Sequence, residues 1–190
     1  MKKFFLFIIT LIALDVASQD SKFSVGLNYP IPFEHNFIND YYNGVIDAEF
    51  NFRAYKTNTL SLGLGLNVGL LKSDDSVIEF NVKSYVFQPK IFVEFNFSKL
   101  HPYLRLGYSS MVFKTKGRSD EIGGYYGVAM SFNNTQSGLN INPGIKYNII
   151  NEFFIQAQYD YILLGVEEPI KNSRYNGAVH IIKIGIGMDL

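Results

Sequence analysis

The chain has 190 residues, with 17 Lys plus Arg balanced by 17 Asp plus Glu, and it contains no Cys and no Trp. The lack of Cys excludes disulfide frameworks, Cys-ligated zinc sites and thiol nucleophiles, and the zero net charge argues against a nucleic-acid-binding protein, which needs a basic surface. Only 18% of the residues are charged, whereas 17 Phe, 13 Tyr and 16 Gly are present. A chain of this length is expected to form one domain.

The first segment, residues 1–18, has the pattern of a signal peptide. Two lysines precede the apolar run Phe4–Leu14, and small residues follow it up to Ser18. A charged start, an apolar stretch of about 7–15 residues and a small-residue cleavage site define such peptides, whereas a spanning helix needs about 20 apolar residues. We therefore expect cleavage after Ser18 or Gln19, export of the protein, and a single domain over residues 19–190.

From about residue 22 onward, apolar and polar residues alternate with a period of two, which is the pattern of β-strands. In Thr59–Leu70 (TLSLGLGLNVGL), every even position is Leu or Val and every odd position is Gly, Ser, Thr or Asn. Pro89 and Pro143 fall inside strands of this kind, where a missing backbone donor predicts β-bulges. The alternation predicts eight strands, at about residues 22–29, 45–55, 59–70, 84–97, 103–113, 138–149, 153–163 and 178–190.

The two faces of these strands differ sharply in composition. One face carries Phe, Tyr, Leu, Ile and Val and has no charged residue in any of the segments, whereas the other combines Gly, Ser and Asn with charged residues. An eight-stranded barrel is only just wide enough inside for side chains, so the bulky apolar face must point outward. The charged residues of the opposite face, expected inside the barrel, are Asp47, Glu49, Glu94, Asp160, Asp189, Arg53, Lys90, Arg105, Lys146 and Lys183.

A charge-free outer face indicates contact with lipid, because a lipid-facing Lys or Arg at mid-depth costs about 2–4 kcal/mol. The connections support this interpretation, since short turns alternate with long loops, as in outer-membrane barrels. We therefore predict an all-β fold, an eight-stranded antiparallel up-and-down transmembrane β-barrel. The long loops lie at about residues 30–44, 71–83, 114–137 and 164–177.

The topology, the segment Asn142–Tyr147 (NPGIKY) and the closing strand HIIKIGIGMDL resemble the small outer-membrane β-barrel proteins of Gram-negative bacteria, the class of the OmpA transmembrane domain and OmpX. The resemblance covers nearly all of residues 19–190. It implies an integral outer-membrane protein with both termini in the periplasm. It also implies contact with outer-membrane lipid, lipopolysaccharide and the outer-membrane assembly machinery, and loops that are free to bind a surface partner.

The inner charges are interpreted as a salt-bridged plug. Buried charges must be paired, and five acids against five bases allow complete pairing. A water-filled channel needs about 16–18 strands, so a general porin is excluded. A narrow ion channel that uses the same charges is the alternative.

A second alternative is a lipid A-modifying enzyme. His35 in the first loop and Asp75-Ser76 in the second resemble the catalytic placement in the lipid A palmitoyltransferase barrel. That enzyme requires an apolar interior for an acyl chain, whereas the inner face here is charged. His180, the last histidine, is expected on the outer face near the rim. We therefore predict a non-enzymatic protein without cofactor or metal, which supports the envelope or interacts through its loops.

Overall fold

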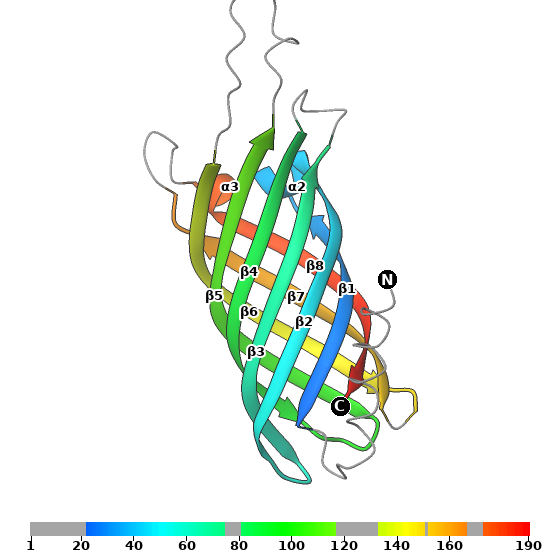
Figure 1. The fold of residues 1–190 in the computed structure, drawn as a ribbon. Helices are drawn as coiled ribbons and strands as arrows, with labels where there is room; N and C mark the ends of the chain where they lie inside the picture. The colour runs from blue at the N-terminus through cyan, green and yellow to red at the C-terminus, as the bar shows by residue number, and fades with distance from the viewer. Residues whose placement is uncertain (1–21, 75–80, 117–132, 151, 167–172) are drawn as a thin grey trace, which may run out of the picture.

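The computed structural model describes residues 22–74, 81–116, 133–150, 152–166 and 173–190. The described chain forms a closed barrel in which each strand pairs antiparallel with its neighbours in sequence and β1 pairs with β8 (Figure 1). The predicted eight-stranded up-and-down barrel is therefore confirmed. The strands are β1 (Phe23–Phe33), β2 (Tyr42–Lys56), β3 (Leu60–Ser73), β4 (Asn81–Phe95), β5 (Leu100–Lys116), β6 (Asn133–Asn148), β7 (Phe153–Leu164) and β8 (Ala178–Asp189).

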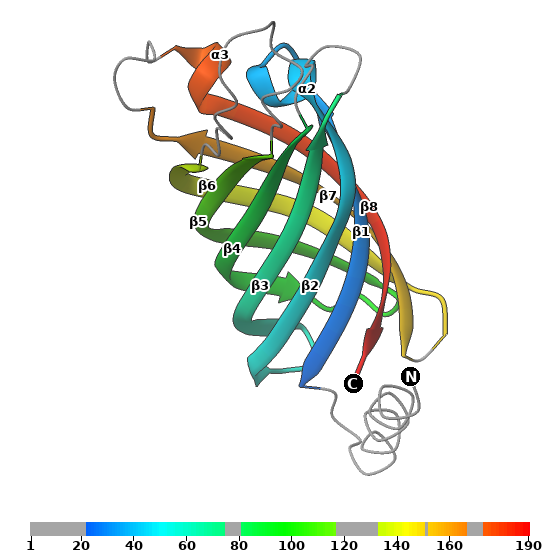
Figure 2. The same ribbon diagram turned by 45° about the horizontal axis from the view of Figure 1, so that its top comes forward.

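The two ends of the barrel differ. Short turns join β2 to β3, β4 to β5 and β6 to β7 at one end, here called the turn end, where β1 also begins and β8 finishes. Two short helices, α2 (Phe37–Tyr41) and α3 (Arg174–Gly177), lie over the opposite end, here called the loop end (Figure 2). Neither helix is long and apolar enough to cross a membrane, and the same holds for every helix in the described residues.

Several strands continue beyond the predicted ends, so the first three predicted loops are shorter than expected. The clearest case is β1, which passes through Pro30 and Pro32 before it ends at Phe33. Pairing with β8 continues to Phe33, whereas pairing with β2 stops at Asn28. The prolines therefore lie where β1 has an open edge, which is where a strand tolerates residues that lack a backbone donor. Gly44 of β2 fits beside this edge because an added Cβ would lie 1.7 Å from the Pro30 oxygen.

The predicted bulges at Pro89 and Pro143 are wrong. The register of β4 against β5 is the same before and after Pro89, and pairing is simply interrupted at Gln88 and Pro89. Pro143 likewise interrupts the pairing of β6 with β7 without a change of register. Each proline keeps its pairing on the other side, so the loss of one donor opens a gap in one ladder rather than inserting a residue. The register shifts between β2 and β3 occur instead around Val45 and Ala54.

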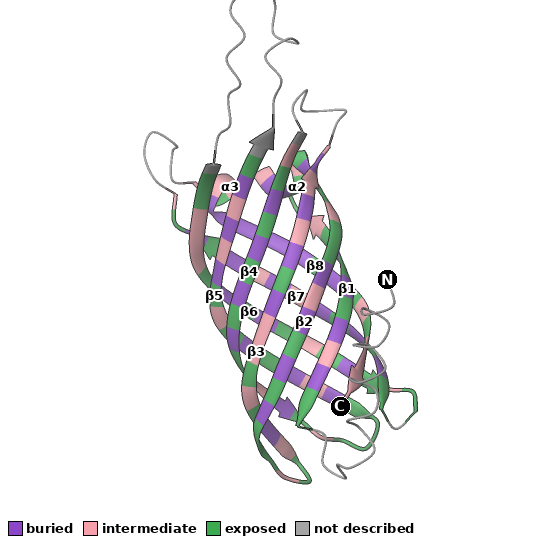
Figure 3. Ribbon diagram, in the orientation of Figure 1, coloured by how far each residue is buried: buried purple, intermediate pink, exposed green. Residues whose placement is uncertain are grey.

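The burial pattern follows the alternation of the strands (Figure 3). Outward apolar side chains are exposed, with Leu139 at 67% and Ile186 at 65%. The inward positions are buried and include many polar residues. The large outward apolar surface is unfavourable in water and favourable in hydrocarbon. This surface is therefore suited to contact with lipid.

Glycines on the inner face make room for aromatic rings. A Cβ added at Gly144 would lie 2.4 Å from the ring of Tyr103, its direct partner across the β5–β6 ladder. A Cβ at Gly187 would lie 2.3 Å from the ring of Phe154 across the β7–β8 ladder. The small residues of the inner face thus allow bulky side chains from the next strand to lie flat across the narrow interior.

Candidate functional site: the barrel interior and its cap

The structure places the ten charged residues expected inside the barrel on its inner face. Asp189, near the turn end, keeps 11% of its side chain exposed, and the other nine are buried. They form three groups that follow one another from the turn end towards the loop end. Each group brings together residues from strands that are far apart in sequence.

The group at the turn end contains Arg53, Glu94, Lys146 and Asp189. Arg53 Nη2 lies 2.9 Å from Asp189 Oδ1 and 3.4 Å from Glu94 Oε1. Lys146 Nζ lies 3.2 Å from the same Glu94 oxygen and 3.4 Å from Asp189 Oδ2. Two cations thus share two carboxylates, which gives a closed and neutral arrangement.

The middle group is the pair of Arg105 and Glu49. Arg105 Nη1 lies 2.6 Å from Glu49 Oε2, and Nη2 donates to Oε1 over 2.8 Å, so the contact is bidentate. The guanidinium carbon also lies 4.0 Å from the centre of the Tyr103 ring, and Nη1 donates to Gln158 Oε1. Glu49 Oε1 accepts a further bond of 2.7 Å from Asn51. A two-point guanidinium–carboxylate contact of this kind fixes both side chains.

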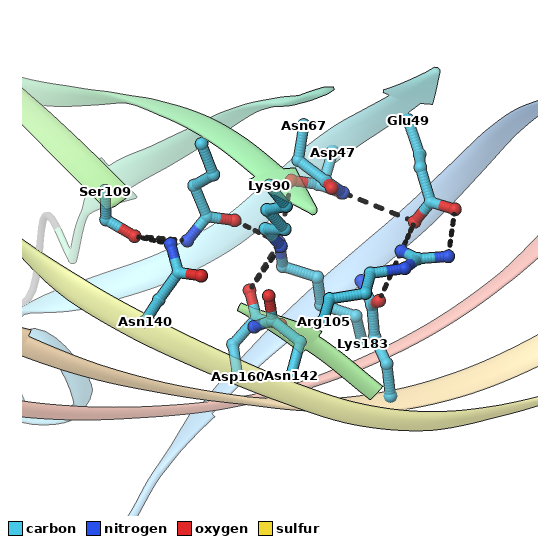
Figure 4. A network of polar contacts seen from close by, with 12 residues as sticks. Asp47, Glu49, Asn67, Lys90, Arg105, Ser109, Asn140, Asn142, Asp160 and Lys183 are labelled. Carbon is cyan, nitrogen blue, oxygen red and sulfur yellow. Dashed lines mark hydrogen bonds and ion pairs between the residues drawn. The ribbon is translucent and has the colours of Figure 1, made fainter. Parts of the chain in front are cut away.

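The third group contains Asp47, Asp160, Lys90 and Lys183 (Figure 4). Lys183 Nζ lies 2.8 Å from Asp160 Oδ2 and 2.9 Å from Asp47 Oδ2. Lys90 Nζ is fully buried and lies 3.9 Å from the same Asp160 oxygen. Neutral side chains complete the group, since Asn67 donates to Asp47 and Asn142 donates to Asp160.

Each of the three groups contains as many acids as bases. A net charge in any cross-section would attract mobile ions of one sign, as the charged rings of selective channels do. Pairing within each group removes that attraction and ties opposite sides of the barrel wall together. Side chains of all three groups therefore cross the interior of the barrel.

Above the third group, towards the loop end, the interior becomes apolar. The prediction of a polar interior is wrong there, because the inner-face positions near the strand ends carry aliphatic and aromatic side chains. These residues bury together as one cluster, and Ile38, Met111, Ile162 and Val179 have no exposed surface. The buried members are Ile38, Tyr42, Leu71, Val86, Met111, Phe113, Ile162, Leu164, Val179 and Ile181.

Helix α2 brings Ile38 into this apolar layer. Asn36 precedes the helix, and its Oδ1 accepts hydrogen bonds of 3.1 Å from the backbone of Ile38 and Asn39. Its Nδ2 donates to the Phe33 oxygen at the end of β1. Asn36 therefore caps the helix and joins it to the barrel wall, which holds the short helix over the interior.

The first and last long connections meet above the barrel. The Tyr175 hydroxyl in α3 donates to Asp40 Oδ2 in α2 over 3.0 Å, and His35 Nδ1 lies 3.1 Å from the same oxygen. Burial and the bond to Asp40 raise the pKa of Tyr175 to about 12. Arg174 Nη2 lies 3.6 Å from Glu34 Oε2. These contacts join α2 and α3 into one cap.

His180 lies on the outer face near the rim, but it is buried, with only 5% of its surface exposed. The rings of Phe33, Tyr159 and Tyr161 lie around it with centroid distances of 5.0–6.0 Å. The Tyr159 hydroxyl lies 2.7 Å from Nδ1, and Glu34 Oε2 lies 3.4 Å from Nε2. The ring packing shields the imidazole from the surroundings of the barrel.

Of the three residues of the enzyme alternative, His35, Asp75 and Ser76, the structure describes only His35. The His35 side chain is 84% exposed and contacts Asp40 and Tyr175. Asp75 and Ser76 lie outside the described residues. No cluster of three or more potential metal ligands occurs within the described ranges.

Comparisons with known proteins agree with the fold. The model of the outer membrane protein beta-barrel domain family matches residues 4–188. The chain belongs to this family. It is therefore an integral outer-membrane β-barrel protein, as the resemblance implied. No curated protein sequence gives a significant match.

Solved structures of similar fold include three bacterial proteins. Neisserial surface protein A (NspA) has a TM-score of 0.59 at 16% identity, over 90% of this chain and 98% of that one. Ail, the attachment invasion locus protein of Yersinia pestis in complex with the heparin analogue sucrose octasulfate, has a TM-score of 0.57 at 15% identity, over 87% and 95%. The N-terminal barrel domain of Pseudomonas aeruginosa OprF has a TM-score of 0.51 at 16% identity, over 87% and 96%.

Proposed function

We propose that this protein is a non-enzymatic, non-conducting barrel that anchors a loop cap in the outer membrane and presents it at the cell surface. The observation that carries the proposal is the filled interior. Three neutral groups of paired charges and an apolar layer follow one another along the axis, and α2 lies above them. An interior occupied in this way leaves the loop end as the surface through which the protein acts.

The proposal assigns the loop end to the outside of the cell and both termini, with the short turns, to the periplasm. Short turns on the periplasmic side and longer loops outside are the rule for such barrels. The chain contains no Cys, so single cysteines can report the orientation. Arg174→Cys at the cap should react with a membrane-impermeant maleimide on intact cells, whereas Lys99→Cys in the β4–β5 turn should react only after the outer membrane is opened. The reverse pattern would contradict the proposed orientation.

The proposed surface role is tested by adherence. Ail, a relative by fold, binds a heparin analogue, which makes heparin a suitable first probe. Cells that carry this barrel should be retained on heparin-coated plates more strongly than cells without it. Cells carrying the double variant Arg174→Ala, Tyr175→Ala, with an altered cap on an unaltered barrel, should lose the difference. A wild-type protein that changed neither heparin retention nor any other contact of the cell surface would contradict a role in surface interaction.

A further inference from the structure

His101 lies at the turn end of the barrel, beside the charged group formed by Arg53, Glu94, Lys146 and Asp189. It is buried, and it lies directly opposite Lys146 in the ladder between β5 and β6. Residues that face each other across a ladder point to the same side of the sheet, so His101 shares the inner face with Lys146. The imidazole is therefore in a position to change the charge of this part of the interior.

The hydrogen bonds around His101 assign its hydrogen to Nδ1. The Asn96 side chain donates from Nδ2 to the Thr57 oxygen over 2.9 Å and to Ser61 Oγ over 3.2 Å. Its Oδ1, which can only accept, lies 3.1 Å from His101 Nδ1, so Nδ1 donates. His101 Nε2 is buried and has no hydrogen-bond partner in the part of the chain that the structure describes. A neutral imidazole therefore satisfies the bond to Asn96, whereas a second proton on Nε2 would find no acceptor among the described residues.

The charges around His101 are already balanced. Arg53 and Lys146 contact Glu94 and Asp189, two cations against two carboxylates. His101 Nδ1 lies 3.8 Å from Glu94 Oε1, the same oxygen that Arg53 and Lys146 contact. A protonated imidazole would be the third cation at this one oxygen, and it would lie opposite Lys146 inside a buried group. The folded chain therefore favours the neutral imidazole.

We propose that His101 makes the turn-end group acid-sensitive, so that uptake of one proton loosens this end of the barrel while the apolar layer at the loop end stays packed. In the unfolded chain the imidazole is free and takes up a proton as the pH falls through about 6.5. The folded chain takes up this proton less readily, so stability is lost as the pH falls and is regained as it rises. The inference goes beyond the proposed surface role, and it does not depend on which side of the membrane the turn end faces.

Proton uptake can be measured for each histidine separately, because the chain has only three, His35, His101 and His180. The sample is the full barrel refolded in detergent micelles, and NMR of isotope-labelled histidine follows each imidazole between about pH 8 and pH 5. The variants His35→Asn, His101→Asn and His180→Asn assign the three signals. His101 should take up its proton at a lower pH than His35, whose side chain is 84% exposed.

Acidification should also accelerate hydrogen exchange at the turn end. The backbone amides of Asn96 and Phe97 donate to the oxygens of Thr59 and Leu100 beside the turn-end group. After correction for the intrinsic effect of pH, these amides should exchange about tenfold faster at about pH 5 than at about pH 8. The amide of Ile162 in the apolar layer should keep its rate, because no part of that layer takes up the proton.

The variant His101→Asn tests the cause of the acid effect. Its amide can donate to Asn96 in place of Nδ1 but takes up no proton, so the acceleration at the turn end should disappear. The matched control is His35→Asn on the exposed side of the cap, which should keep the acceleration. Heat-modifiable migration on a gel reports whether each variant is folded. If His101→Asn does not fold, the order of proton uptake in the wild-type barrel decides the question.

Proton uptake by His101 at the same pH as His35, or at a higher one, would overturn the inference. Acid-accelerated exchange that persists in the folded His101→Asn barrel would overturn it too, as would equal acceleration at both ends of the wild-type barrel. These measurements involve neither the cap nor a ligand, so their failure is distinguishable from a failed labelling or heparin test of the proposed function.

Discussion

The interior of this barrel contains two chemically different regions. From the turn end to the middle, buried charges are paired in neutral groups, whereas towards the loop end the same inner face carries aliphatic and aromatic side chains. A buried ion pair contributes little net stability, because the cost of removing two charges from water offsets their attraction. The apolar layer gains stability directly from burial. The charged part therefore contributes little net stability, and the apolar part contributes more.

The largest effect should follow from breaking the middle charged group. Arg105→Met leaves Glu49 buried without its bidentate partner, so we expect a loss of about 3–5 kcal/mol in the free energy of unfolding. Urea unfolding of the refolded barrel measures it. The double variant Arg105→Met, Glu49→Gln removes both charges and should recover more than half of the loss. A double variant as unstable as the single one would show that the charges do not act as a pair.

The apolar layer should respond to lost volume instead of lost charge. Ile162 has no exposed surface, so Ile162→Ala should cost about 3 kcal/mol through lost burial and the cavity left behind. Ile162→Val, which removes a single methylene, should cost about 1 kcal/mol. Both values come from the same urea unfolding assay. Equal costs for the two changes would mean that this layer is not close-packed.

The attachment of α2 to the apolar layer should depend on its cap. Asn36→Ala removes the side chain that accepts from Ile38 and Asn39, with an expected cost of about 1 kcal/mol. The loss should be local, so hydrogen exchange of the α2 amides should accelerate while that of the barrel strands stays unchanged. Asn36→Asp keeps an acceptor at the same position and serves as the control. Unchanged exchange in α2 after Asn36→Ala would contradict the role of the cap.

The smallest effect is expected on the exposed side of the cap. His35 is 84% exposed at its side chain, so His35→Ala should change the free energy of unfolding by less than about 0.5 kcal/mol. The lipid A acyl pattern of cells carrying this variant, measured by mass spectrometry, should match that of wild-type cells. An acyl pattern that depended on His35 would contradict the non-enzymatic proposal and support the enzyme alternative.

The sequence predicts the barrel well because strand alternation is a local property. The side-chain period of two in Thr59–Leu70 determines which face is apolar, and the charged residues of the other face follow from the same parity. The ion-pair partners of these charged residues cannot be predicted from the alternation. Arg53 and Asp189 are 136 positions apart, and they meet only because the strands close with a particular stagger.

The apolar layer could not be recognised from alternation alone. In Val179–Ile182 both faces are apolar apart from His180. The alternation of polar and apolar residues is therefore lost where the inner face becomes apolar. The predicted first strand ended before Pro30, because proline usually ends a strand unless one edge is unpaired. In the structure β1 continues past Pro30 along an edge that β2 does not pair with. The start of α2 could have been predicted from Asn36, since Asn before a short amphipathic segment is a common helix start.

A barrel whose interior is filled from end to end has no continuous path for ions. Current through single refolded barrels in a planar lipid bilayer measures whether such a path exists, with insertion verified by heat-modifiable migration of the recovered protein. We predict no stepwise conductance in the wild-type protein at either polarity. Reproducible ohmic steps that scale with salt concentration would show a continuous water path through the charged groups and the apolar layer, and would rule out the filled interior.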